Sequence, residues 1–120
     1  MDRSPLTRIP AFLVVALALA ACGGSIPVPT TGPHLGDTPV SVPSMPPPGK
    51  VEIVGTPPAT LKRPVWIDGE WIWTGRRWQW KEGRWEDPQG DYWAPAITVR
   101  LADGSLAHFK GLWKSGAAPK

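Results

Sequence analysis

Tryptophan takes six positions in the apolar and polar pattern from Val65 to Glu86, and in Trp71-Ile-Trp73 and Trp78-Gln-Trp80 it recurs at every second residue. A period of two is that of a β-strand whose side chains point alternately to its two faces. Three dipeptides interrupt the pattern, Asp68-Gly69, Gly75-Arg76 and Glu82-Gly83. Each is typical of a two-residue hairpin loop, since such loops favour glycine at positions with positive φ. The sequence therefore predicts a four-strand antiparallel meander.

The three loops predict registers that agree with one another. Asp68-Gly69 places Trp66 opposite Trp71, Gly75-Arg76 places Trp71 opposite Trp80 and Trp73 opposite Trp78, and Glu82-Gly83 places Trp80 opposite Trp85. Six rings then share one face, which is the candidate binding face: Trp66, Trp71, Trp73, Trp78, Trp80 and Trp85. Two interpretations remain open. The rings form the core of the domain, or they form an exposed platform for a sugar ring, a peptide or an acyl chain.

A second hairpin is predicted near the C-terminus. Residues 97–101 alternate apolar and polar side chains, and they meet residues 106–109 across a loop that contains Asp103-Gly104. A four-residue loop places Leu101 opposite Leu106 and Val99 opposite His108. We expect this hairpin either to cover the tryptophan face or to extend the sheet.

The segments from Trp66 to Trp71 and from Trp80 to Trp85 both fit the pattern W-x-x-G-x-W, fourteen residues apart. In this the chain resembles bacterial proteins with WxxGxW (YXWGXW) repeats, many of which look like envelope lipoproteins. The resemblance extends over about half the chain, from Pro64 to about Trp113. It implies no catalytic residues, and the chain lacks the histidine that many members have within the motif.

The first 21 residues have basic residues followed by an apolar run at 11–21. This run is too short for a membrane-spanning helix, which needs about 20 residues, and it is typical of a signal peptide. It ends in Leu19-Ala-Ala-Cys22, which resembles the lipobox of bacterial lipoproteins and implies that Cys22 carries the lipid. An ordinary secretion signal beside an unrelated cysteine is the alternative. Gly23 in place of aspartate implies transport to the outer membrane.

Prolines concentrate between the cysteine and residue 60. Proline fixes φ and donates no hydrogen bond, so we expect a disordered or polyproline-like spacer. The predicted organisation is a signal helix (1–21), a lipidated cysteine with a disordered linker (22–60), an all-β domain (61–115) and a frayed tail (116–120). No helical apolar stripe occurs outside the signal.

Composition limits the chemistry. The net charge is +3, and +2 after removal of the signal, which is too low to indicate a nucleic-acid partner. The chain has one cysteine and two histidines, His34 in the linker and His108 in a predicted strand, so neither a metal site nor a catalytic residue is predicted. No cofactor motif occurs.

These features predict a non-enzymatic envelope protein, anchored by lipid in the outer membrane, whose small β domain has a structural or interaction role. Its partners are the membrane and an envelope glycan or protein. The alternative is a module that binds peptidoglycan or surface polysaccharide through the tryptophan face.

Overall fold

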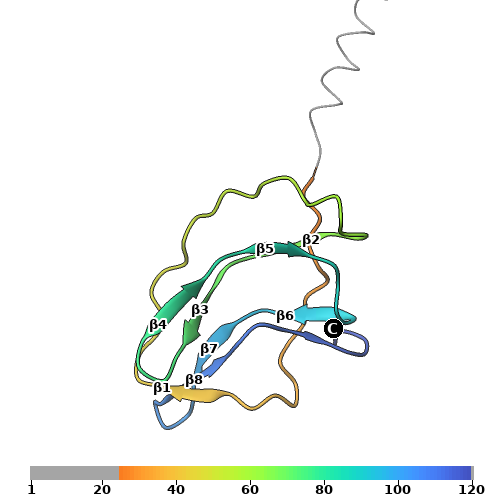
Figure 1. The fold of residues 1–120 in the computed structure, drawn as a ribbon. Coiled ribbons are helices and arrows are strands. Elements are labelled where there is room, and N and C mark those ends of the chain that lie inside the picture. The colour runs from red at the N-terminus through yellow and green to blue at the C-terminus, as the bar shows by residue number, and fades with distance from the viewer. Residues whose placement is uncertain (1–24, 120) are drawn as a thin grey trace, which may run out of the picture.

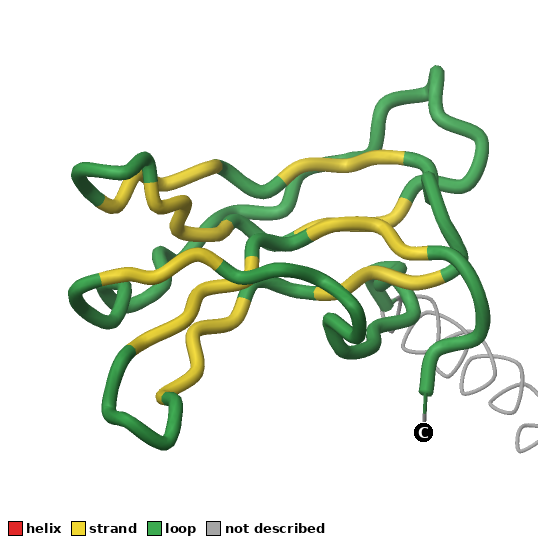
Figure 2. Tube along the Cα trace, turned by 90° about the horizontal axis from the view of Figure 1, so that it is seen from below, coloured by secondary structure: helices red, strands yellow, loops and turns green. Residues whose placement is uncertain are grey.

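A computed structural model describes residues 25–119 of the chain. The predicted signal segment 1–21 and the lipidation residue Cys22 lie outside this range. The described residues contain strands and loops but no helix, which confirms the all-β prediction (Figure 2). The strands are β1 (Val40–Val42), β2 (Val65–Ile67), β3 (Glu70–Trp73), β4 (Trp78–Lys81), β5 (Arg84–Glu86), β6 (Tyr92–Ala94), β7 (Ile97–Arg100), β8 (Leu106–Phe109) and β9 (Leu112–Lys114).

Strands β2 to β5 form one long hairpin rather than the predicted four-strand meander. β3 pairs with β4, and β2 pairs with β5 in the same register. The loop at Gly75-Arg76 closes it, with Gly75 at φ 97° and the Thr74 amide bonded to the Arg77 carbonyl at 3.0 Å. Trp71 therefore faces Trp80 and Trp73 faces Trp78, as predicted, but Trp66 faces Trp85. Pairing of Trp66 with Trp71 and of Trp80 with Trp85 is wrong.

The other two dipeptides are breaks in the strands and not turns. Asp68-Gly69 separates β2 from β3, and Glu82-Gly83 separates β4 from β5 on the opposite side of the hairpin. Neither Gly69 nor Gly83 has the positive φ that a type I′ turn requires. We refer to this pair of breaks as the kink of the first hairpin.

Strands β6 to β9 form a second hairpin of the same design. β7 pairs with β8, and β6 pairs with β9 beyond a break at residues 95–96 and 110–111. Its loop has three residues, 102–104, because Gly104 is at φ 87° and the Leu101 amide bonds to the Ser105 carbonyl at 2.8 Å. This loop moves the register by one residue from the prediction, so Leu106 faces Arg100 and His108 faces Thr98.

The two hairpins are structural repeats. β6 and β7 begin 27 residues after β2 and β3, and β8 and β9 begin 28 residues after β4 and β5. The extra residue lies in the longer second loop. Figure 1 shows the hairpins as two layers that lie side by side, with β1 next to β8. No ladder joins the hairpins, so the second hairpin does not extend the first sheet.

The second hairpin covers the mixed face of the first hairpin and not its tryptophan face. Glu70 accepts a hydrogen bond from the Gly111 amide at 2.9 Å, Glu86 accepts one from the Trp113 indole, and Arg84 lies over the Trp93 ring. These residues alternate with the tryptophans in β3 and β5, so they point to the other face. The expectation that residues 97–109 cover the tryptophan face is wrong, although His108 contacts Trp78 and three residues of this segment line a cavity together with three of the six tryptophans.

The proline-rich stretch is part of the fold over its described residues, 25–60, which corrects the prediction of a disordered linker there. The Thr30 carbonyl and the Gly32 amide bond to the backbone of Trp93 at 2.7 and 2.9 Å, and β1 pairs with β8. Residues 44–55, here called the strap, then run over the first hairpin on its outer side (Figure 1). Lys50–Val54 adopts no strand.

The buried residues lie mainly in β6 and β8 of the second hairpin, together with one residue of β1 and one of β2. Ile67 is 1% exposed, and Ala94 is 0% exposed. The other buried apolar residues are Val42, Tyr92, Trp93, Leu106 and Ala107. A core this small leaves much of the stability of the domain to the aromatic pairs and to the strap.

Candidate functional site

Two copies of the W-x-x-G-x-W pattern face each other across the first hairpin. The first tryptophan of each copy pairs with the second tryptophan of the other, which gives Trp66 with Trp85 and Trp71 with Trp80. The rings of each pair meet edge to face, with centroids 5.6 and 5.2 Å apart. Edge-to-face pairs of this kind contribute about 0.5–1.5 kcal/mol beyond their burial.

The glycine of each copy makes room for a ring from the other copy. A methyl group added at Gly83 would lie under 3.0 Å from the ring of Trp66, and one added at Gly69 would lie equally close to the ring of Trp80. The spacing of the motif is thus explained by packing, because the first indole of each copy covers the glycine of the other copy.

Glu52 in the strap binds this kink from outside. Its carboxylate accepts the Gly69 amide at 3.1 Å and the Gly83 amide at 2.9 and 3.0 Å. Val51 and Ile53 on either side are 100% and 96% exposed, so Glu52 alone of the three points inward. The strap thus supplies acceptors for two backbone amides that the broken ladder leaves unpaired.

Indole N–H groups hold the rest of the strap. Trp71 donates to the Pro48 carbonyl at 3.1 Å, Trp85 to the Gly55 carbonyl at 3.0 Å and Trp78 to the Ser44 hydroxyl at 3.4 Å. One ring of each pair therefore reaches the strap, so the three pairs line the same side of the hairpin, as predicted.

The second hairpin contains a degenerate copy of the same arrangement. Trp93 faces Trp113 with centroids 5.4 Å apart, and a methyl group at Gly111 would lie under 3.0 Å from the Trp93 ring. Glu70 binds the Gly111 amide as Glu52 binds Gly83. Thr98 and His108 replace the inner tryptophan pair, and they share a hydrogen bond of 2.8 Å.

Sequence reasoning missed this second copy. Its signal is present in the spacing His108-x-x-Gly111-x-Trp113, opposite Trp93-x-x-Ala96. Only two of the four tryptophan positions are kept, so a search for intact motifs passes over it.

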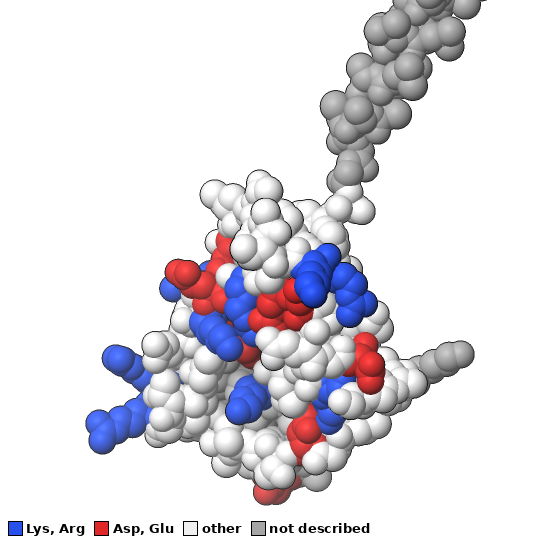
Figure 3. All heavy atoms as spheres, turned by 45° about the vertical axis from the view of Figure 1, so that its right-hand side comes forward, with Lys and Arg blue, Asp and Glu red and all other residues white. Residues whose placement is uncertain are grey.

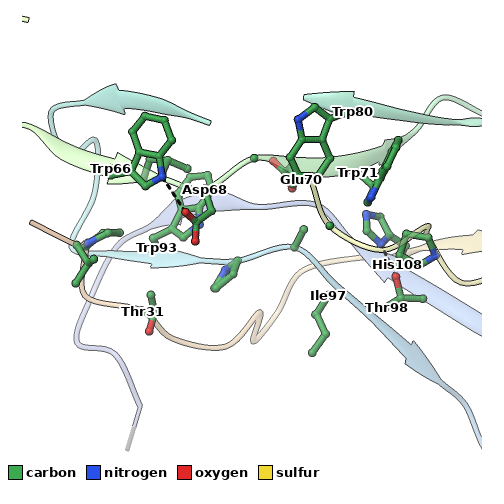
Figure 4. A pocket seen from close by; sticks show the side chains of 18 of the residues that line it. Thr31, Trp66, Asp68, Glu70, Trp71, Trp80, Trp93, Ile97, Thr98 and His108 are labelled. Carbon is green, nitrogen blue, oxygen red and sulfur yellow. Dashed lines mark hydrogen bonds between the residues drawn. The ribbon is translucent and has the colours of Figure 1, made fainter. Parts of the chain in front are cut away.

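A cavity of about 570 Å³ lies between the kinks of the two hairpins. Proline-containing segments at 28–31 and 46–49 line its remaining sides. Figure 4 shows Trp66, Trp71 and Trp80 of the first hairpin on one side of it and Trp93, Thr98 and His108 of the second hairpin around it. A cavity of this size is within the range of small-ligand sites, and its aromatic lining is typical of them.

The cavity also contains two acidic side chains, Asp68 and Glu70. One oxygen of Asp68 accepts the Trp66 indole N–H at 2.8 Å, and one oxygen of Glu70 accepts the Gly111 amide. The second oxygen of each makes no hydrogen bond within residues 25–119. Among the described residues that line the cavity there is no lysine or arginine.

The side chains of both histidines are buried. His108 is 4% exposed, and burial lowers its pKa from the usual value of 6.5 although Glu70 and the Trp71 carbonyl favour the charged form. Its Nε2 has no hydrogen-bond partner among the described residues. His34 stacks on Phe109, donates a hydrogen bond from Nε2 to the Pro95 carbonyl at 2.6 Å, and has its Nδ1 3.0 Å from a carboxylate oxygen of Asp37.

The six residues of the candidate binding face thus divide into two groups. Trp66, Trp71 and Trp80 line the cavity, whereas Trp73, Trp78 and Trp85 do not. All six are half-buried, so the face is neither a closed core nor an open platform. Trp93, which was not predicted as a site residue, completes the aromatic lining.

Two further searches concern the described residues alone. Residues 25–119 contain no helix that is long and apolar enough to cross a membrane. The same range contains no group of three histidine, cysteine or acidic side chains placed to hold a metal ion. Comparison of the chain with protein-family models, with curated proteins and with solved structures finds no match.

Proposed function

We propose that the protein is a non-enzymatic, lipid-anchored protein of the cell envelope that displays a small β domain for a structural or binding role. The observation that supports this proposal is the structural role of the tryptophans. Their rings pair across the hairpin, cover the kink glycines and hold the strap, so the most unusual residues of the chain build a stable display unit. The same use supports kinship with the WxxGxW proteins, because every position of the motif has a packing role.

The anchor is proposed at Cys22, which ends the lipobox-like segment. Cys22→Ser should abolish incorporation of a labelled fatty acid and move the protein out of the membrane fraction. Retention of the label in the serine variant would refute the anchor. Gly23→Asp leaves the cysteine in place and should redirect the protein from the outer to the inner membrane, which fractionation of the two membranes measures.

The second candidate function is the binding of an envelope glycan, and the cavity between the kinks favours it. Indole faces stack on the apolar faces of sugar rings, and nearby acidic and hydroxyl side chains accept or donate hydrogen bonds. Here four tryptophans surround a space that also contains Asp68, Glu70 and Thr98.

This candidate can be tested by sedimentation of the full chain in mild detergent with insoluble peptidoglycan. Trp66→Ala removes a ring from the cavity, and Trp73→Ala removes an equally paired ring outside it. Trp66→Ala should lose binding while Trp73→Ala retains it, with thermal melts used to compare their stability. Equal binding by both variants would contradict a role for the cavity.

A further inference from the structure

The residues that line the cavity include acidic side chains but no lysine or arginine. Asp68 and Glu70 both line it, each with one carboxylate oxygen that makes no hydrogen bond within the described part of the chain. They come from the same kink, one residue on either side of Gly69. A concave site lined by two carboxylates attracts cations and repels anions.

Lys50 and Arg84 each lie beside a ring of the cavity but do not line it. Lys81, which is opposite Glu70 in the first hairpin, does not line it either. The Lys50 ammonium lies 5.4 Å from the centre of the Trp71 ring. The Arg84 guanidinium lies over Trp93 and forms an ion pair with Glu86 at 2.7 Å. On the outer surface the two signs are mixed, as one face of the molecule shows in Figure 3. Within residues 25–119 neither Asp68 nor Glu70 forms an ion pair.

The aromatic lining and the volume of the cavity indicate the size and shape of the ligand. Trp66, Trp80 and Trp93 offer aromatic surface, and a volume of about 570 Å³ is far more than a simple ammonium ion fills. Aromatic faces attract both cations and the C–H faces of sugar rings. The ligand that meets all these conditions is a compact ring that carries a positive charge.

We propose that the cavity binds a glycan unit with a free, protonated amino group. Its ammonium lies between the carboxylates of Asp68 and Glu70, and its ring lies against the tryptophans. This inference rests on the glycan-binding candidate and specifies its ligand. N-acetylation removes the charge and weakens binding.

Two oligosaccharides that differ only in acetylation provide the test. The full chain in mild detergent is titrated with the β-1,4-linked dimer of glucosamine and with that of N-acetylglucosamine, and tryptophan fluorescence or calorimetry gives the affinities. The glucosamine dimer should bind about tenfold tighter, as expected for one charge-assisted hydrogen bond. Its affinity should fall with added salt.

Amide variants remove the charges but keep the structural hydrogen bonds. Asp68→Asn retains an acceptor for the Trp66 indole, and Glu70→Gln retains one for the Gly111 amide. Each should reduce affinity for the glucosamine dimer about tenfold and leave that for the N-acetylated dimer unchanged. Glu82→Gln, which removes an equal charge from the same hairpin outside the cavity, should change neither affinity.

The outcomes separate this inference from the function on which it rests. Equal or tighter binding of the N-acetylated dimer, or full preference for the glucosamine dimer in both amide variants, would overturn the amino-group inference and leave glycan binding standing. Binding of neither dimer would also overturn it. Glycan binding as such is decided by the sedimentation experiment with Trp66→Ala and Trp73→Ala, carried out with peptidoglycan before and after chemical N-deacetylation. Binding of the unchanged chain to neither form would refute it.

Discussion

Gly83 meets two requirements that no other residue type satisfies. Its amide must reach both oxygens of Glu52, at 2.9 and 3.0 Å, and its α-carbon must leave room for the ring of Trp66. The Ile67 carbonyl lies on the same side, 2.9 Å from the position of an added methyl group. Since backbone atoms cannot move aside as a flexible side chain can, any Cβ here has to displace the hairpin or the ring.

Gly83→Ala should therefore destabilise the domain by about 1–3 kcal/mol, the usual cost of overpacking. The urea midpoint of the full chain measures this. Gly49→Ala is the control, because it introduces the same methyl group in the strap where nothing lies within 4 Å. Equal stability of the two variants would show that the ring of Trp66 does not pack on the kink.

His108 gives the domain a pH-dependent stability. Burial lowers its pKa in the folded state, while the unfolded chain binds a proton with the ordinary pKa near 6.5. Between these two values the unfolded state carries more protons, so the free energy of unfolding falls as the pH drops. Hydrogen bonds that they accept lower the pKa values of three aspartates: Asp37, Asp87 and Asp103. The stability that these carboxylates contribute is therefore lost only as the pH falls below about 3.8.

Urea midpoints measured at about pH 7.5 and about pH 5 test this pH dependence, because the two values lie on either side of the ordinary histidine pKa. The full chain should be less stable at the lower pH, and His108→Gln should reduce that difference. His34→Gln removes the other histidine and serves as the control. An unchanged pH difference in His108→Gln would assign the effect to another group.

At the scale of elements, the six tryptophans and their alternation predicted strands and the pairing around Gly75-Arg76 correctly. The same local rules failed at Asp68-Gly69, because one long hairpin keeps Trp66 opposite Trp85 and places both kink amides where Glu52 reaches them. That carboxylate lies 17 residues before Gly69, so a dipeptide rule has no information about it. The cavity was equally hidden, since its residues come from both hairpins and the strap.

Substitution of Trp71 and of Trp73 distinguishes two contributions to stability, the pairing of rings within the hairpin and the hydrogen bond to the strap. Both lie in β3 and pair with a ring in β4, but Trp71 also donates its indole N–H to the Pro48 carbonyl of the strap. Trp71→Phe should be less stable than Trp73→Phe by about 1 kcal/mol, the net value of one hydrogen bond. Chemical denaturation of both variants measures the difference, and equal stabilities would mean that the indole does not hold the strap.

At the scale of the whole molecule, the structure is a series of layers that complete one another. The strap supplies Glu52 to the kink of the first hairpin, and the first hairpin supplies Glu70 to the kink of the second. The position in the second hairpin that corresponds to Glu70 is Ile97, which is 50% exposed. The strap is therefore the first layer: it supplies a glutamate to the first hairpin as the first hairpin supplies one to the second.

This order predicts that the domain does not fold without its proline-rich part. A fragment of residues 57–120 lacks Glu52, β1 and the carbonyl acceptors of Trp71 and Trp85, so it loses several hydrogen bonds at about 0.5–1.5 kcal/mol each and exposes the surface that the strap covers. A domain of this size has too little stability to absorb such losses. Circular dichroism melts should show cooperative unfolding for residues 25–120 and none for 57–120, with Glu52→Ala in the longer fragment between them. If the shorter fragment unfolds cooperatively at the same temperature, the proline-rich segment is a spacer, and the layers do not depend on one another.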